Sequence, residues 1–283
     1  MPLRKGDNFI ERSLVGALSF LKESVFAEEY ASRKGLLQSL DPRIKTATFL
    51  LFIVQILLTK SIVILSGLYV FCLLLSGLSN IRLGFFLKRT WVFIPLFSLF
   101  IAVPALFNFI TPGEALVTFN VAGITFTITR QGLAGASLFV MRVLTSVSFA
   151  ILLSITTRHF ELLKVLRIFK IPQVFVMTLG MCYRYIFLFV EIIEDTYLAI
   201  KSRVGARIHY KKGQHIVAWN IASLWARSYQ LNEDVYKAML SRGYQGEPLI
   251  LEEFKIKARD WRWLFLVLII STLLFYLNYH VKI

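Results

Sequence analysis

Long apolar runs separated by short basic segments make up most of this chain. The runs cover residues 46–59, 62–78, 91–110, about 132–156 and about 263–279. A membrane-spanning helix needs about 20 mostly apolar residues. The first run has 14 residues, so it spans a bilayer only if its helix extends at one end or Lys60 snorkels to the surface. The pattern predicts an all-α polytopic membrane protein with about five transmembrane helices.

Local signals refine the boundaries of these runs. Apolar residues recur at steps of three and four within 8–31, which predicts an amphipathic helix before the first run. Asp41 is suited to cap a helix whose first residue is Pro42, because proline needs no N–H there. Arg43 belongs to the basic pair that follows, which is a suitable stop at a membrane face.

Two further signals interrupt the helical pattern. The third run contains Pro95 and Pro104, which predict a kink. Apolar and polar residues alternate within 111–131 around Ala122-Gly123, which predicts a short β-hairpin.

The basic residues predict how the chain is oriented. The formal net charge is +15, and the segment 158–262 contains 17 Lys and Arg against 10 Asp and Glu. Cytoplasmic loops of membrane proteins are enriched in Lys and Arg. We therefore expect a cytoplasmic N-terminal segment 1–45, a four-span bundle 46–157 and a cytoplasmic helical domain 158–261. Within the bundle, the basic segment 79–90 would lie on the cytoplasmic side and the hairpin outside. A final transmembrane helix 262–283 would end outside.

One segment allows two topologies. Residues 172–190 are apolar enough to span, but Tyr183-Arg184-Tyr185 interrupts them and the helical pattern continues with polar residues. We interpret the segment as one helix of roughly 30 residues that starts at Pro172 and lies at or below the membrane face. A true span here would reverse the topology of everything that follows.

The sequence lacks the motifs of a self-contained enzyme. It contains no G-x-x-x-x-G-K-[ST] loop, no H-E-x-x-H and no paired cysteine motif, so we expect no bound cofactor and no metal site in this chain. Arg142 lies inside the fourth apolar run, where a charge is costly. It either contacts a partner membrane subunit or bonds to backbone carbonyls of its own bundle.

Two similar motifs occur in the charged segment, each with an arginine near the end of an expected helix. The first places Ser202, Arg203 and Val204 together, and the second places Ser241, Arg242 and Gly243 together. Glycine at position 243 is suited to a helix C-cap, and a cation suits the negative end of the helix dipole. The planar guanidinium group binds a carboxylate in two places, so each arginine is suited to an acidic groove. Ordinary helix ends are the alternative interpretation.

From about Phe9 to Tyr276 the sequence resembles a known family, the CbiQ-type transmembrane component of energy-coupling-factor transporters for cobalt and nickel. The resemblance depends on several segments that occur in order and at similar spacings. They are Phe9-Ile10-Glu11-Arg12-Ser13-Leu14, Phe26-Ala27-Glu28-Glu29, Gly35 to Lys45 with Asp41-Pro42-Arg43, Leu153-Ser154-Ile155-Thr156-Thr157, Ile171-Pro172, Tyr183-Arg184-Tyr185 and Val235 to Gly246 with Ser241-Arg242-Gly243.

The resemblance implies a non-catalytic subunit of a transporter in a prokaryotic cell membrane. In this family two cytoplasmic helices each end in an X-Arg-X motif, and the arginines dock into two ATP-binding-cassette ATPases, which bind ATP and Mg²⁺. Arg242 matches the second motif. The first departs from the common Ala-Arg-Gly, and Arg203 matches it by its spacing from Arg184, with Arg207 in a competing register.

The remaining partners follow from the same resemblance. ATP-driven closure of the ATPases would move the two helices, whose apolar upper faces would press on a metal-specific, substrate-binding membrane subunit. The expected face includes Phe175, Val176, Leu179 and Met181. The family's N-terminal pattern favours cobalt over nickel, and the lipid bilayer rather than nucleic acid accounts for the basic charge. A self-sufficient permease and a membrane-embedded enzyme are the alternatives.

Overall fold

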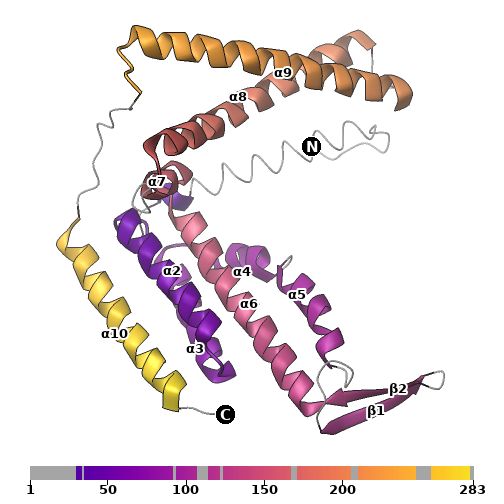
Figure 1. Cartoon of the computed structure of the whole chain (residues 1–283), viewed down its shortest axis with the longest axis vertical. Coiled ribbons are helices and arrows are strands. Elements are labelled where there is room, and N and C mark those ends of the chain that lie inside the picture. Colours follow the sequence, from indigo (N-terminus) through magenta and orange to yellow (C-terminus); the bar gives the residue numbers. More distant parts are fainter. Residues whose placement is uncertain are drawn as a thin grey trace. The chain divides into compact units, whose positions relative to one another are not determined.

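A computed structural model describes residues 30–33, 35–91, 94–106, 114–121, 124–166, 171–204, 210–246 and 256–280. Within them the chain forms a series of helices and one pair of strands (Figure 1). The elements are α2 Pro42–Leu58, α3 Ile62–Leu78, α4 Leu83–Trp91, α5 Ile94–Ala102, the 3₁₀ turn η1 Pro104–Leu106, β1 Ala115–Val121, β2 Ile124–Thr129, α6 Arg130–Thr156, α7 His159–Val165, α8 Gln173–Val204, α9 Tyr210–Ser241 and α10 Ala258–His280.

The chain divides into two compact units. Residues 27–162 and 254–283 form the first, which we call the bundle unit, and residues 1–26 and 163–253 form the second, which we call the α8–α9 unit. The amphipathic helix predicted over 8–31 lies outside the described residues except for residues 30 and 31, which are helical.

The helices confirm a polytopic membrane protein. Three described helical segments are long and apolar enough to cross a bilayer: Arg130–Thr156, Gln173–Thr196 and Ala258–His280. Helix α3 is a shorter apolar helix of 17 residues, and α2 has the same length. The predicted runs at 132–156 and 263–279 therefore correspond to α6 and α10, each of which begins earlier than its apolar run.

The bundle unit is organised around α6, which packs against α2, α3 and α5. The side chains of Phe49, Phe52 and Phe149 are completely buried at this contact. The Phe149 ring centroid lies 5.7 Å from that of Phe49 and 5.3 Å from that of Phe52. Aromatic pairs at such distances add to the packing energy of a core. This cluster fixes α2 against α6.

The start of α2 confirms the predicted cap. Asp41 is the N-cap residue, its side-chain oxygen accepts a hydrogen bond of 2.8 Å from the Arg43 N–H, and Pro42 is the first helical residue. The helix thus begins four residues before the apolar run 46–59 and has 17 residues in all.

The third apolar run is not one kinked helix, so the prediction for 91–110 needs correction. Helix α4 covers most of the basic block 79–90, α5 begins at Ile94, and η1 begins at Pro104 after α5 has ended. Proline lacks the N–H that would continue the helix at position 104, whereas Pro95 is tolerated in the first turn of α5. Lys88 and Arg89 lie in the last turn of α4, where the helix dipole favours cations.

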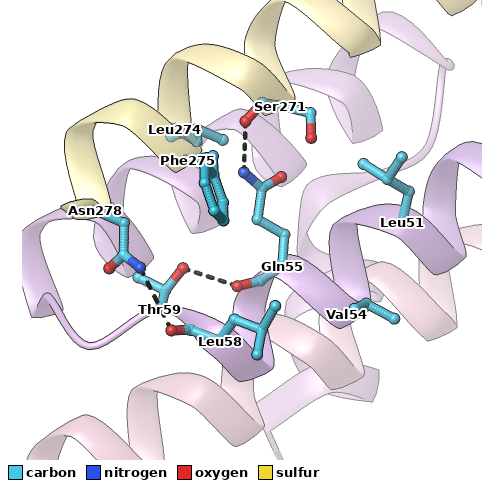
Figure 2. A pocket seen from close by; sticks show the side chains of 9 residues that line it. All are labelled: Leu51, Val54, Gln55, Leu58, Thr59, Ser271, Leu274, Phe275 and Asn278. Atoms are coloured by element: carbon cyan, nitrogen blue, oxygen red, sulfur yellow. Dashed lines mark hydrogen bonds between the residues drawn. The ribbon is translucent and has the colours of Figure 1, made fainter.

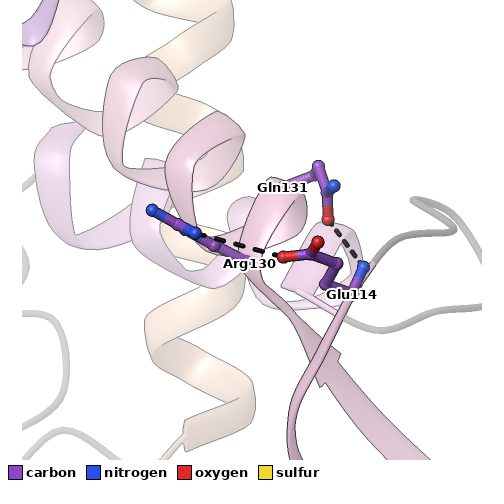
Figure 3. Close-up of polar contacts among 3 residues, drawn as sticks. All are labelled: Glu114, Arg130 and Gln131. Atoms are coloured by element: carbon purple, nitrogen blue, oxygen red, sulfur yellow. Dashed lines mark hydrogen bonds and ion pairs between the residues drawn. The ribbon is translucent and has the colours of Figure 1, made fainter.

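The β-hairpin is present where the sequence predicts it. Strands β1 and β2 pair antiparallel, with an irregularity between Ala115 and Val117, and their turn at 122–123 lies outside the described residues. Figure 3 shows how the base of the hairpin joins α6: the Glu114 N–H donates to Gln131 Oε1 at 2.9 Å, and Arg130 lies 4.0 Å from the Glu114 carboxylate.

Candidate functional site at the ends of helices α8 and α9

Helix α8 is a single helix of 32 residues, as the sequence predicts. Its first part, Gln173–Thr196, is long and apolar enough to span a bilayer, so length and apolarity alone leave both topologies of this segment open. Tyr183 packs edge-on against the Phe187 ring at 5.3 Å between centroids, and the Arg184 side chain is exposed. Tyr183 therefore packs on a neighbouring turn of α8, whereas the Arg184 side chain is exposed.

Both predicted motifs lie at the C-terminal ends of long helices. Arg203 is the residue before Val204, the last residue of α8, and Arg242 directly follows Ser241, the last residue of α9. Both arginine side chains are exposed. The competing Arg207 lies outside the described residues. The structure thus presents two guanidinium groups at two helix ends.

The serine before each arginine has the same local geometry. Ser202 Oγ donates to the Ala199 carbonyl at 2.8 Å, and Ser241 Oγ donates to the Ala238 carbonyl at 2.9 Å. Each hydroxyl bonds to the carbonyl three residues earlier, a common local bond of serine in helices. The two motifs therefore share this serine bond, while Arg203 lies within the last turn of α8 and Arg242 just after the last residue of α9.

The end of α9 confirms the predicted glycine cap. Gly243 has a φ of +83°, in the left-handed region that side chains other than glycine rarely adopt. The Gly243 N–H donates to the Leu240 carbonyl, and the Tyr244 N–H donates to the Met239 carbonyl, both at 3.0 Å. These two bonds form a Schellman motif. The cap ends the helix sharply at Arg242, which fixes the direction in which that side chain leaves it.

The two arginines cannot grip one small ligand together. Helix α9 extends about 48 Å between Tyr210 and Arg242 at 1.5 Å per residue. The seven residue steps from Arg203 to Tyr210 reach at most about 25 Å. The Cα atoms of the two arginines are therefore at least about 20 Å apart. The site is suited to two separate contacts with a large partner.

An exposed apolar stripe runs along the first half of α8. Its members are spaced four, three and four residues apart, which places them on one helix face. They are Phe175, Leu179, Cys182 and Ile186, with Phe175 64% exposed. The prediction that Val176 belongs to the exposed face is wrong, because its side chain is only 7% exposed, and Met181 is half-buried. The regular spacing was the signal that identifies Cys182 and Ile186 instead.

Helix α9 exposes large aromatic side chains. Trp225 is 80% exposed, and Trp219, Tyr229 and Tyr236 are each more than half exposed. Tryptophan and tyrosine are the residues most often found at the energetic centre of protein interfaces. The two helices contact each other and cross in the view of Figure 1.

Arg142 bonds to the backbone of its own bundle. Its Nη2 donates to the Thr59 carbonyl at 2.8 Å, at the C-terminal end of α2. This contact agrees with the expectation that Arg142 bonds to backbone carbonyls of its own bundle. The helix dipole of α2 also favours a cation at this end of the helix.

A pocket of about 390 Å³ lies between α2 and α10 (Figure 2). Gln55 Nε2 donates to the Ser271 carbonyl at 2.8 Å, and Asn278 accepts a hydrogen bond from the Lys60 N–H. None of the nine lining residues, all within the described part of the chain, is charged. The described residues also contain no group of three or more His, Cys, Asp or Glu placed to hold a metal ion. This pocket is therefore poorly suited to bind a metal cation.

The sequence matches one protein family over most of its length. The sequence model of the CbiQ family, described as cobalt transport protein, matches residues 33–254.

Individual relatives cover nearly the whole chain. An uncharacterized protein of Methanocaldococcus jannaschii is 37% identical over 95% of this chain and 91% of its own length. The energy-coupling factor transporter transmembrane protein EcfT of Streptococcus thermophilus is 28% identical over 88% of this chain and 97% of its own length. The EcfT protein of Staphylococcus aureus is 27% identical over 92% and 99%, respectively.

Proposed function

Because the chain belongs to the CbiQ cobalt transport protein family, we propose that it is the transmembrane coupling subunit of an ATP-driven importer of cobalt or nickel ions. Similar proteins are named as transmembrane proteins of energy-coupling factor transporters. In this proposal the chain binds neither ATP nor the ion. It transmits movement from two cytoplasmic ATPases to a substrate-binding membrane subunit in a prokaryotic cell membrane, with its own N-terminus on the cytoplasmic side.

The ATPases are contacted by Arg203 and Arg242, one subunit each. The observation that supports this assignment best is that both arginines are exposed at the C-terminal ends of two long helices. An exposed guanidinium group at the negative end of a helix is suited to enter an acidic groove, where it binds a carboxylate in two places. The separation of at least about 20 Å between the arginines matches two grooves on two subunits rather than one.

The substrate-binding subunit is contacted by the apolar stripe of α8. Phe175, Leu179 and Ile186 are exposed and lie on one helix face. A surface of this kind gains free energy when a second apolar helix covers it. The apolar stripe and Arg203 lie on the same helix, α8. A movement of Arg203 with its ATPase therefore also moves the stripe that contacts the substrate-binding subunit.

The alternatives are a self-sufficient permease and a membrane enzyme. The pocket between α2 and α10 does not support ion binding, because its lining has no charge.

The arginines can be tested by pull-down of the two ATPases and by uptake of radiolabelled Co²⁺ in cells. Truncating one partner of a buried charge pair costs about 2–5 kcal/mol. Each single Arg→Ala variant should therefore lose on the order of 30- to 3,000-fold in affinity at its own contact. The two contacts act bivalently, so a single variant can stay assembled while transport falls.

The double variant Arg203→Ala with Arg242→Ala should release both ATPases while the bundle still folds. Arg→Lys at either position should rescue only partly, because lysine lacks the planar fork. Arg227→Ala is a matched control, since this arginine is also exposed but lies in the middle of α9, far from the helix end. Full ATPase binding and full uptake by the double variant would contradict the proposal.

A further inference from the structure

A buried carboxylate joins the first turns of α10 and α2. Asp260, only 1% exposed, uses Oδ2 to accept a 2.8 Å bond from the Lys257 N–H at the start of α10. Its Oδ1 accepts a 3.0 Å bond from the Asp41 N–H, 219 residues away in sequence. Asp41 in turn caps α2 through its own side chain. One carboxylate therefore fixes the beginnings of two helices against each other.

A buried ammonium group joins α2 to the end of α6. Lys45 is also 1% exposed, and its Nζ donates to the carbonyls of Thr156 at 2.9 Å and Leu37 at 3.1 Å. Thr156 is the last residue of α6, so its carbonyl is one that has no partner within the helix. A cation at this position also complements the helix dipole. Lysine is almost never fully buried without such partners.

These contacts lie beside two places, which we call the exits, where the chain passes between the bundle unit and residues 163–253. Thr156 precedes the boundary at Leu163 by seven residues, and Asp260 follows the boundary at Glu253 by seven residues. The two exits are distant in sequence, yet the short segment from Asp41 to Lys45 bonds to the helix at each of them. All of these residues belong to the bundle unit itself.

We propose that Lys45 and Asp260 are positioning residues that hold α6 and α10 fixed at the two exits, so that the bundle is a rigid support against which α8 and α9 move. Without them the first turn of α10 and the last turn of α6 would yield, and the movement would be lost at the junctions. This inference rests on the proposed coupling function. It assigns a role in coupling to two residues that lie outside the proposed ATPase-binding arginines and outside the apolar stripe.

The test uses the complete transporter in proteoliposomes, with both ATPases and the substrate-binding subunit. Asp260→Asn keeps the size of the side chain but replaces one accepting oxygen with a donor, and Lys45→Met removes the ammonium group. The measured quantities are complex yield, ATP hydrolysis and uptake of radiolabelled Co²⁺. We expect both variants to assemble and to hydrolyse ATP, while the number of ions taken up per ATP falls at least about five-fold, the lower end of the couplings found between binding sites.

Gln55→Met is the matched control. It removes a polar contact between the same two helices, α2 and α10, at Ser271, far from both exits. It should keep the wild-type ratio of ions to ATP. If Lys45→Met does not accumulate, the size-conserving Asp260→Asn decides the question.

Two results would overturn the inference. One is a wild-type ratio of ions to ATP in both Lys45→Met and Asp260→Asn. The other is an equal fall of this ratio in Gln55→Met, which would indicate that the general packing of α10 matters rather than the contacts at the exits. Absence of ATP-driven uptake by the wild-type complex would instead contradict the proposed function, so the two failures are distinguishable.

Discussion

The bundle unit and the α8–α9 unit differ in how many of their side chains are buried. The bundle unit buries phenylalanines completely, and it even buries Lys45 and Asp260 with their hydrogen-bond partners. In α8 and α9, Val176 is the only side chain that the described residues show as buried. Trp225 is 80% exposed and Phe175 64% exposed; the outer surface of the bundle unit exposes apolar side chains as well, such as Phe100 at 76%, but only the bundle unit also has a buried core.

This difference indicates how the two units are stabilised. The bundle unit has an internal core of buried side chains that several of its helices contribute. The α8–α9 unit leaves apolar and aromatic surface uncovered, and such surface marks interaction sites. We therefore regard the bundle as the fixed part of the molecule and α8–α9 as the part that partners complete.

The largest expected effect comes from removing one aromatic ring from each unit. Phe52→Ala should destabilise the chain by about 3–5 kcal/mol, because it opens a cavity beside Phe149 and Phe71. Trp225→Ala should change stability by less than about 0.5 kcal/mol, because that ring is exposed. Thermal unfolding of the purified chain in detergent measures both. Equal destabilisation by the two variants would remove the basis of the comparison.

A smaller effect is expected at the cap of α9. Gly243→Ala forces a side chain into the left-handed region, which costs about 1–2 kcal/mol. The last turn of α9 should fray and present Arg242 poorly, so amide exchange there should accelerate and ATPase affinity should fall. Gly135→Ala in α6 is the control, since an added Cβ meets no atom within 4 Å there. If exchange at the end of α9 is unchanged by Gly243→Ala, the cap does not position the arginine.

The smallest effect is expected at the hairpin. The Glu114 and Arg130 side chains are 77% and 75% exposed and 4.0 Å apart, and exposed ion pairs contribute about 0.2–1 kcal/mol. Glu114→Gln should therefore lower stability by about 0.2 kcal/mol or less, since the backbone bond from the Arg130 N–H to the Glu114 carbonyl remains. A shift in thermal unfolding as large as that of Gly243→Ala would show that this exposed pair matters more than its geometry indicates.

The features that the sequence predicts correctly are those determined by neighbouring residues. The Asp41–Pro42 cap, the glycine cap at Gly243 and the hairpin each depend on a few consecutive positions. The long helix α8 follows from a continuous helical pattern. Local conformational preference is sufficient for all of these.

The features that the sequence does not predict depend on distant contacts. Asp260 bonds to Asp41 across 219 positions, and Lys45 bonds to Thr156 across 111. Nothing local distinguishes Lys45 from a solvated lysine at a membrane face. The prediction that Val176 is exposed is wrong because the apolar character of a residue does not determine which face of the helix it occupies. The functional roles of Arg203 and Arg242 remain predictions that the fold does not test.

The central claim is that partners complete the α8–α9 unit through its two arginines while the bundle stays fixed. Amide hydrogen exchange of the purified chain, with and without the two ATPases, tests this most directly. We expect new protection within 173–204 and 210–246, concentrated near Arg203 and Arg242, with little change in α2, α3 and α6. The variant Arg203→Ala with Arg242→Ala should show no such protection. Protection centred on α2, α3 and α6, or unchanged protection of α8 and α9 in the double variant, would contradict the account.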